Sequence, residues 1–297
     1  MSKQQLAKLL ELSAENPPPA NATPPVLRAW AETITSHTPL ADGVTISRSS
    51  LGPYEGDLIL PENGDNSRLI IYYHGGGFFI FSAATYRVTT TNLARASGAA
   101  VFAPDYRLAP EHPAPAAHDD AFGVYRAALL HGYTAEKIAL SGDSAGGNLA
   151  LATVVRARHA KLPLPSSLAL FSPWLDFAEE GETYRRIADD PIVLRPMLDS
   201  FKQAYLGDRD RKSPEITPFD ADFRGLPPTL VHVGSWERLL DDSGTLAARL
   251  KSAGVTAELK IFDGMCHGWQ LFAPMLDEGM ESIEQAARFI KDNGVSK

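Results

Sequence analysis

The stretch Gly142-Asp143-Ser144-Ala145-Gly146 lies between an apolar run, residues 137–140, and a helix-like stretch, residues 148–158. This order predicts a strand, a sharp turn with Ser144 at its apex, and then a helix. Such a turn exposes a serine hydroxyl above a sheet, where a histidine and a substrate can both reach it. A plain turn is the alternative interpretation, because glycine and serine are also common in ordinary turns.

Three consecutive glycines follow a second apolar run, residues 69–73, and are bounded by tyrosines and phenylalanines. Glycine lets the backbone approach a ligand closely, so that N–H groups can point at a single oxygen. The aromatic neighbours argue against a flexible linker. We therefore expect an oxyanion hole formed by backbone N–H groups of Gly75, Gly76, Gly77 and Ala145.

A general base is predicted at His267, which follows a strand-like stretch, residues 255–262, and a turn. A catalytic imidazole needs an acid that orients it and stabilises its protonated form. In the chain order serine, acid, histidine, that acid must lie between Ser144 and His267. The single cysteine, Cys266, is interpreted as a packing residue, because neighbouring side chains in a loop usually point apart.

Three acids follow a predicted strand at residues 229–234 and are candidates for this role. Glu237 lies nearest the strand end, where the catalytic groups of parallel sheets gather. Asp241 and Asp242 are also explained as favourable charges at a helix N-terminus. We expect Glu237 to be the acid and keep Asp241 as the alternative.

Three motifs together resemble the bacterial hormone-sensitive lipase-like carboxylesterases, also called family IV. They are HGGGF at residues 74–78, DYRLAPEHP at residues 105–113 and GDSAGGN at residues 142–148. The resemblance covers residues 40–297 and implies an α/β-hydrolase fold with a helical cap. It also implies hydrolysis of short- to medium-chain acyl esters through a covalent acyl-enzyme. One departure is that the family's acid is commonly an aspartate followed by proline, whereas Glu237 and Arg238 stand here.

The pattern of apolar runs predicts a fold of the α/β class. Strand-like and helix-like stretches alternate from residue 69 to residue 290, which favours a mostly parallel central sheet with helices on both faces. Residues 44–47 and 57–60 are expected to form an antiparallel edge. We expect a catalytic core from residues 41–179 and 213–297, and a discontinuous cap from residues 1–40 and 180–212. A disordered tail is the alternative for residues 1–25.

The DYRLAPEHP motif is interpreted as support for the glycine loop, with Asp105 and Arg107 paired and Tyr106 beside them. Substrate contact by Arg107 or His112 is the alternative. Aromatic residues near the motifs predict an apolar substrate pocket, and we expect it to include Phe78, Phe79, Trp174 and Trp269.

Composition excludes several classes of function. A net charge of −8 without a basic run argues against nucleic-acid binding. No stretch approaches the ~18 apolar residues of a membrane span, no secretory signal is evident, and one cysteine suits a reducing compartment, so we expect a cytoplasmic protein. No motif indicates a metal or an organic cofactor. The resemblance implies a homodimer through an edge strand near residues 257–262.

Two further functions are compatible with these motifs. An amide hydrolase of the arylformamidase type would use the same three side chains. A non-catalytic small-molecule receptor is the other, like the plant gibberellin receptors that resemble the same family. Those receptors lack the catalytic histidine, whereas His267 is present here.

Overall fold

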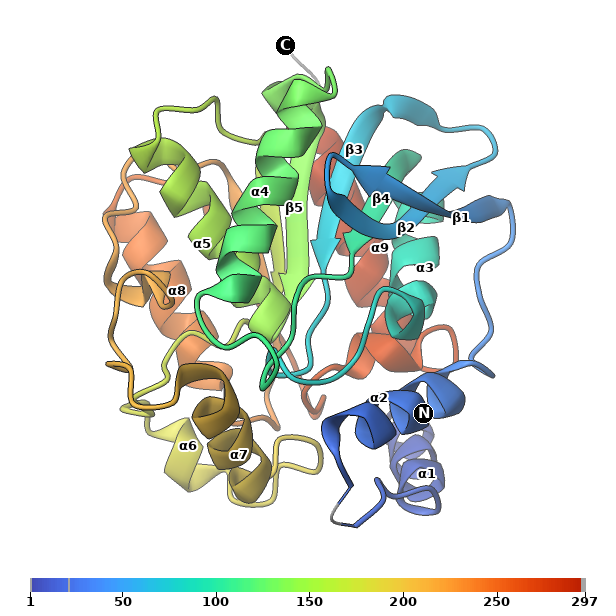
Figure 1. Cartoon of the computed structure of the whole chain (residues 1–297). Coiled ribbons are helices and arrows are strands. Elements are labelled where there is room, and N and C mark those ends of the chain that lie inside the picture. The colour runs from blue at the N-terminus through green and yellow to red at the C-terminus, as the bar shows by residue number, and fades with distance from the viewer. Residues whose placement is uncertain (1, 21, 295–297) are drawn as a thin grey trace.

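A sheet of eight strands forms the centre of the computed structural model, which describes residues 2–20 and 22–294 (Figure 1). Its strand order is β1-β2-β4-β3-β5-β6-β7-β8. The first two strands are antiparallel, and the others run parallel to one another, so the predicted fold class and antiparallel edge are confirmed. The strands are β1 (Val44–Leu51), β2 (Tyr54–Pro61), β3 (Asp65–Tyr73), β4 (Ala99–Pro104), β5 (Ile138–Asp143), β6 (Ser167–Phe171), β7 (Thr229–Gly234) and β8 (Ala257–Phe262).

Helices cover both faces of the sheet. This explains why β3 contains a continuous apolar run, residues 69–73. Ile70 and Tyr72 pack on the face covered by α3 (Arg87–Ser97) and α9 (Asp277–Asn293). Ile71 and Tyr73 point to the opposite face, because successive side chains of a strand alternate. That face is covered by α4 (Ala116–Leu130), α5 (Ala145–His159) and α8 (Leu240–Ser252). Short 3-10 turns complete the chain at Ala84–Tyr86, Ala135–Lys137, Pro218–Asp220 and Trp269–Phe272.

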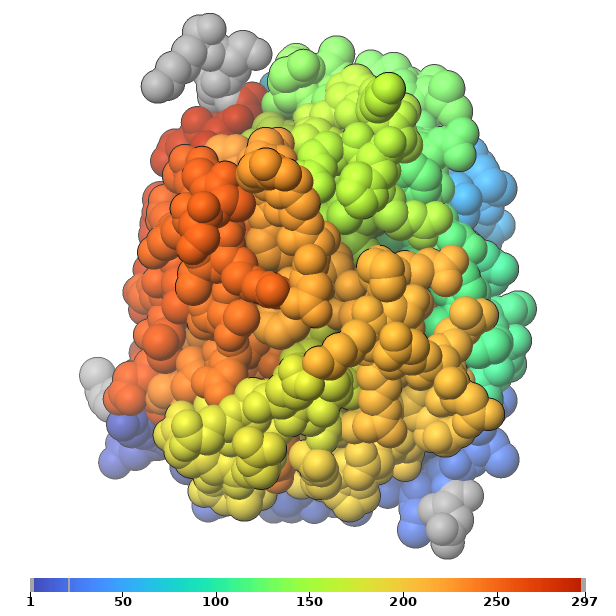
Figure 2. All heavy atoms as spheres, turned by 90° about the vertical axis from the view of Figure 1, so that its left-hand side faces the viewer, coloured from blue at the N-terminus to red at the C-terminus, as the bar shows by residue number. Residues whose placement is uncertain are grey.

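Four helices lie together at the end of the sheet where β3 and β5 terminate (Figure 1). They are α1 (Ser2–Ala14), α2 (Pro24–Thr35), α6 (Thr183–Arg186) and α7 (Arg195–Leu206). Figure 2 shows the yellow residues, near residue 180 on its colour bar, close to the blue N-terminal residues at this same end. Because α1 and α2 are helical, the disordered tail is not what the described residues show.

Helix α7 begins only at Arg195, after a turn at residues 190–193. Asp190 accepts hydrogen bonds from the backbone N–H groups of Ile192 and Val193, at 3.0 and 2.8 Å, and holds them in a turn. The helix then starts at Arg195 with a proline in its first turn, where the missing N–H has no helical partner.

Side chains from these helices bind the loops that follow the strands. Arg28 of α2 donates to the carbonyl oxygens of Phe79 and Ala109 at 3.0 and 2.7 Å. Tyr205 of α7 stacks on Phe78, with ring centroids 4.1 Å apart. Both contacts fix helices against the segment that follows β3.

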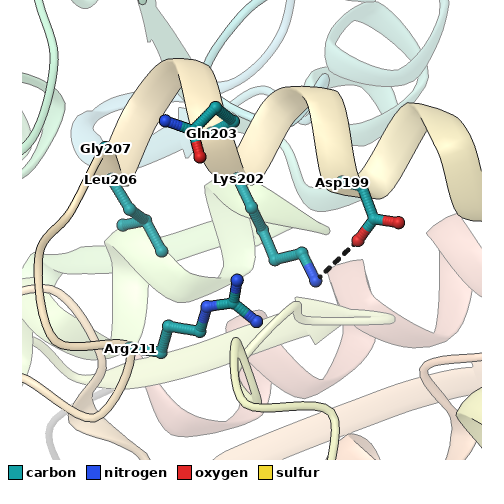
Figure 3. Close-up of a pocket in the computed structure, with 6 residues that line it drawn as sticks. All are labelled: Asp199, Lys202, Gln203, Leu206, Gly207 and Arg211. Carbon is teal, nitrogen blue, oxygen red and sulfur yellow. Dashed lines mark ion pairs between the residues drawn. The ribbon is translucent and has the colours of Figure 1, made fainter.

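A hollow of about 320 Å³ lies beside α7 (Figure 3), and its lining includes none of the predicted catalytic residues. Lys202 binds Asp199 at 3.0 Å on its wall, and its other lining residues are Gln203, Leu206, Gly207 and Arg211.

Among residues 2–20 and 22–294, no helix combines the length and the apolar character needed to cross a membrane.

Candidate active site

Ser144 lies at a sharp turn between β5 and α5, as the sequence predicts. Its backbone has φ 52° and ψ −121°, a conformation that non-glycine residues rarely adopt. Gly146 faces the carbonyl oxygen of Tyr73 so closely that any Cβ there would clash with it. Glycine is therefore required beside the serine, and the plain-turn interpretation does not account for this strain.

The glycine loop after β3 lies beside this turn. Gly76 has a φ of 101°, which favours glycine. The N–H of Gly75 already donates to Asp143 Oδ1 at 2.9 Å, which corrects the expectation that Gly75 faces a substrate oxygen. Along the described chain, we find no backbone acceptor for the N–H groups of Gly76, Gly77 or Ala145.

Asp143, which precedes the serine, has a role that no sequence pattern indicated. Besides the N–H of Gly75, its carboxylate accepts the hydroxyls of Tyr72 and Tyr86 at 3.1 and 2.6 Å. Burial raises the pKa of Asp143 to about 6, although the hydrogen bonds from Tyr86 and Tyr72 oppose that shift. The carboxylate thus joins the serine turn to the glycine loop.

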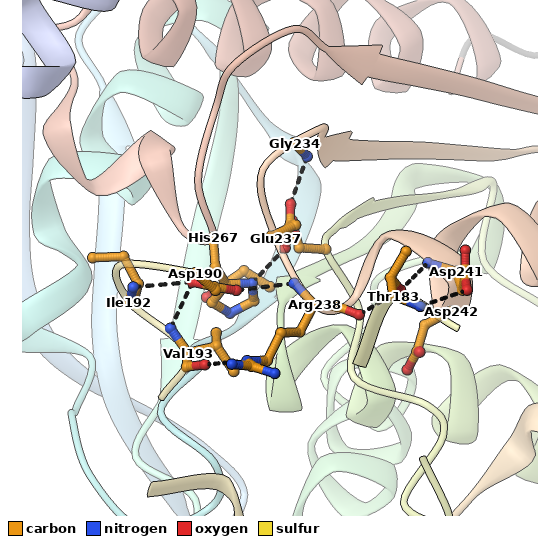
Figure 4. Close-up of polar contacts among 12 residues, drawn as sticks. Thr183, Asp190, Ile192, Val193, Gly234, Glu237, Arg238, Asp241, Asp242 and His267 are labelled. Atoms are coloured by element: carbon orange, nitrogen blue, oxygen red, sulfur yellow. Dashed lines mark hydrogen bonds and ion pairs between the residues drawn. The ribbon is translucent and has the colours of Figure 1, made fainter. Parts of the chain in front are cut away.

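Glu237 and His267 meet at the same edge of the sheet (Figure 4). His267 Nδ1 lies 2.7 Å from Glu237 Oε2, and its N–H donates this hydrogen bond to the carboxylate. Burial lowers the pKa of His267, but the hydrogen bond to Glu237 and the charges of Glu237, Asp190 and Asp143 outweigh it, so that the pKa is raised above its ordinary value. The pair therefore favours the protonated imidazole.

The loops after β6, β7 and β8 hold this pair. Ser172 donates to Glu237 Oε1 at 2.7 Å, and the N–H of Gly234 binds the same oxygen. Trp236 N donates to Met265 O at 3.0 Å, which ties the loops after β7 and β8 together. Both oxygens of the carboxylate thus accept hydrogen bonds.

The other two candidate acids have different partners. Asp241 accepts the N–H of Thr183 at 2.9 Å. Asp242 accepts the N–H groups of Leu175 and Asp176, each at 2.8 Å. Neither forms a hydrogen bond with His267 in the described structure.

Three of the four aromatic residues predicted to line the substrate pocket are buried. Phe78 and Trp174 are fully buried and stack on each other, and Trp269 lies in a separate cluster with Leu6 and Phe262. Only Phe79 is partly exposed, and it stacks on Phe201 of α7 with ring centroids 5.0 Å apart. Phe201 also covers Gly77. The sequence held no signal for Phe201, because its position depends on where α7 packs.

Cys266 packs in the same cluster as Trp269 and is fully buried. Burial raises the pKa of its thiol to about 12, so the reactive thiolate is not formed near neutral pH.

The DYRLAPEHP segment supports the glycine loop, but not through the expected ion pair. Tyr106 donates to the carbonyl oxygen of His74 at 2.7 Å. Arg107 binds Asp120 at 2.8 Å, and Asp105 binds Arg48 at 2.7 Å, so the predicted pairing of Asp105 with Arg107 is wrong. Arg48 lies on β1 and Asp120 on α4, so each of the two charges has its partner in a different element.

Comparison with known proteins adds independent evidence. Residues 70–271 match the model of a family described as having the alpha/beta hydrolase fold. An esterase of Acinetobacter venetianus is 35% identical over 95% of this chain and 93% of its own length. An acetyl-hydrolase of Streptomyces hygroscopicus is 36% identical over 85% of this chain and 83% of its own.

A solved structure of an esterase from the bacterial hormone-sensitive lipase family superposes on the chain with a TM-score of 0.94. The two sequences are 38% identical, and the match covers 98% of this chain and 99% of the other.

The position of Asp143 predicts a large effect on stability. Asp143→Ala leaves two tyrosine hydroxyls and one N–H without acceptors in the interior. We expect the free energy of unfolding to fall by about 3 kcal/mol in urea titrations. Asp292→Ala, at an exposed position of α9, serves as the control and is expected to stay within about 0.5 kcal/mol of the parent. Equal stability of the two variants would contradict the bonding role of Asp143.

Proposed function

The chain belongs to the bacterial hormone-sensitive lipase-like family of α/β-hydrolases and is a carboxylic ester hydrolase, and we propose that Ser144, Glu237 and His267 form its catalytic triad. The observation that carries this proposal is the 2.7 Å contact between His267 Nδ1 and Glu237 Oε2. It occurs at the edge of the sheet where Ser144 occupies its strained turn. A hydrolytic activity also removes the reason to consider a receptor.

The first half of the reaction forms an acyl-enzyme. Nε2 of His267 takes the proton of Ser144 as the hydroxyl oxygen attacks the ester carbonyl. Glu237 stabilises the imidazolium that results. The N–H groups of Gly76, Gly77 and Ala145 are the proposed donors to the oxyanion, and each such donor is worth about 3 kcal/mol of transition-state stabilisation.

The second half releases the acid. His267 gives its proton to the departing alcohol and then removes a proton from water, which attacks the acyl carbon. The bond from the acyl carbon to Ser144 Oγ then breaks, and His267 returns the proton to Oγ. The products are the alcohol, the carboxylic acid and free Ser144. The side chains named here suffice for these steps.

A discontinuous cap, residues 1–40 and 180–212, is the proposed cover of this site, with residues 41–179 and 213–297 as the core. Ser144 and His267 are only 9% and 8% exposed, which supports a cover that limits access. The Phe79–Phe201 pair and the acetyl-hydrolase relative support short to medium acyl chains as substrates.

A substrate panel tests the triad and the acyl range together. We expect p-nitrophenyl acetate and butyrate to be cleaved faster than the palmitate ester, and matched amides to be cleaved slowly. Ser144→Ala should lower kcat at least about a thousandfold, because it removes the nucleophile. A fluorophosphonate should phosphonylate Ser144 of the parent protein with loss of fluoride, and the mass of the phosphonyl group should be absent from Ser144→Ala.

Ser252→Ala, on the exposed surface of α8, is the matched control and should keep full activity. Turnover by Ser144→Ala close to that of this control would eliminate Ser144 as the nucleophile. Faster cleavage of amides than of esters would instead favour the arylformamidase type.

The pH profile tests the acid. His267 must be neutral to accept a proton, and its pKa is raised, so kcat/KM should fall as the pH drops through a midpoint above about 6.5. Glu237→Gln removes the main cause of this shift. It should move the acid limb to lower pH and reduce kcat at least about a hundredfold. Asp241→Asn should have a much smaller effect, and the reverse result would transfer the role to Asp241.

A homodimer through β8 is also proposed. This strand lies at the edge of the sheet, pairing with β7 on one side, and Ile261 is 51% exposed on it. Open edge strands favour pairing with another chain.

Light scattering at several concentrations tests this assembly. We expect a mass twice the 32.1 kDa of one chain and a shift toward the monomer in Ile261→Lys. Leu130→Lys alters another exposed apolar side chain, at the end of α4, and should leave the mass unchanged. A monomer at every concentration would refute the dimer.

A further inference from the structure

Arg238 directly follows the proposed triad acid, and all its polar groups bind one segment of the proposed cap, residues 183–193. The side chain is buried. Five hydrogen bonds join it to this segment: its N–H to Asp190 Oδ2 at 2.9 Å, its carbonyl from Thr183 Oγ1 at 2.7 Å, and Nε, Nη1 and Nη2 to the carbonyl oxygens of Val193, Tyr184 and Ala188 at 2.9, 2.6 and 2.8 Å.

The guanidinium group of Arg238 donates hydrogen bonds to backbone carbonyl oxygens. It forms no ion pair among the residues that the structure describes. Arginine suits such a site, because its planar fork presents several donors in fixed directions and stays charged when buried. Without the guanidinium group, the carbonyl oxygens of Val193, Tyr184 and Ala188 would lose the hydrogen bonds that attach them to Arg238.

Asp190 is a further buried carboxylate of the site, besides Glu237 and Asp143. All three of its hydrogen bonds come from backbone N–H groups, those of Ile192, Val193 and Arg238. Figure 4 shows it in one cluster with Arg238 and the Glu237–His267 pair. Its charge contributes to the raised pKa of His267, after the hydrogen bond and charge of Glu237.

We propose that Arg238 and Asp190 are positioning residues for the ester-hydrolysing reaction: Arg238 fixes residues 183–193, and these hold the Asp190 carboxylate where it stabilises protonated His267. This inference rests on the proposed triad. Residues 183–193 therefore have two functions in this proposal. They cover the site, and they supply the charge of Asp190, which stabilises protonated His267.

The physical basis is the positive charge that His267 gains when it takes the serine proton. In a buried site, each carboxylate nearby stabilises that charge more than it would in water. The groups that act on His267 are Glu237 from the loop after β7, Asp190 from the segment before α7 and Asp143 from β5. Cys266, the neighbour in sequence, remains a neutral thiol.

Asp190→Asn tests the charge with little change in shape. Its side-chain oxygen can still accept the N–H groups of Ile192 and Val193, whereas the NH2 group that replaces Oδ2 loses the hydrogen bond from the N–H of Arg238. We expect the acid limb of kcat/KM to move to lower pH and kcat to fall about tenfold with little change in KM. The matched control is Asp189→Asn, an exposed neighbour, which should keep the parent profile.

Arg238→Lys tests the anchor, since lysine keeps the charge and loses the fork. We expect it to shift the acid limb in the same direction as Asp190→Asn, whereas Arg185→Lys, an exposed residue of α6, should not. If Arg238 acts through Asp190, the double variant Asp190→Asn/Arg238→Lys should show much less than the sum of the two single effects on kcat.

Two results would overturn the proposal. One is an unchanged acid limb in both variants with only a lower melting temperature, which would indicate a purely structural role. The other is full additivity in the double variant. Failure of the triad itself would look different, since Ser144→Ala would then retain activity. Inactive Ser144→Ala together with parent-like Asp190→Asn would reject only the positioning role.

Discussion

The carboxylate of Asp143 joins the parts of this site that must be placed relative to each other. It accepts hydrogen bonds from β3 through Tyr72, from the 3-10 turn at Ala84–Tyr86 through Tyr86, and from the glycine loop through Gly75. A buried carboxylate is costly unless its oxygens are bonded, so these donors are constrained to remain where they are. The serine turn and the loop that faces it are therefore held by one residue adjacent to the nucleophile.

Parallel strands explain how residues far apart in sequence converge. The loops after β3, β5, β7 and β8 all leave the same edge of the sheet and carry the glycine loop, Ser144, Glu237 and His267. Glutamate is one methylene longer than the aspartate common in the family. This longer side chain is held in place, because Ser172 and Gly234 bind its Oε1 while its Oε2 contacts His267.

Polar contacts attach the segment before α7 to this edge. Backbone carbonyl groups of residues 184–193 surround Arg238, and backbone N–H groups surround Asp190. Buried hydrogen bonds of this kind have strict geometry, whereas apolar contacts tolerate sliding. The segment is consequently fixed in position with respect to the triad acid, while the Phe79–Phe201 contact nearby is apolar.

The sequence by itself determined the strands and the serine turn, because periodicity and glycine placement are local properties. The bounds of β7 agree with the strand predicted at residues 229–234. Partners distant in sequence were decided only by the tertiary structure: Arg107 binds Asp120 instead of Asp105, and the N–H of Gly75 binds Asp143. Such pairs depend on how helices and loops pack across the sheet, and no local pattern encodes those distances.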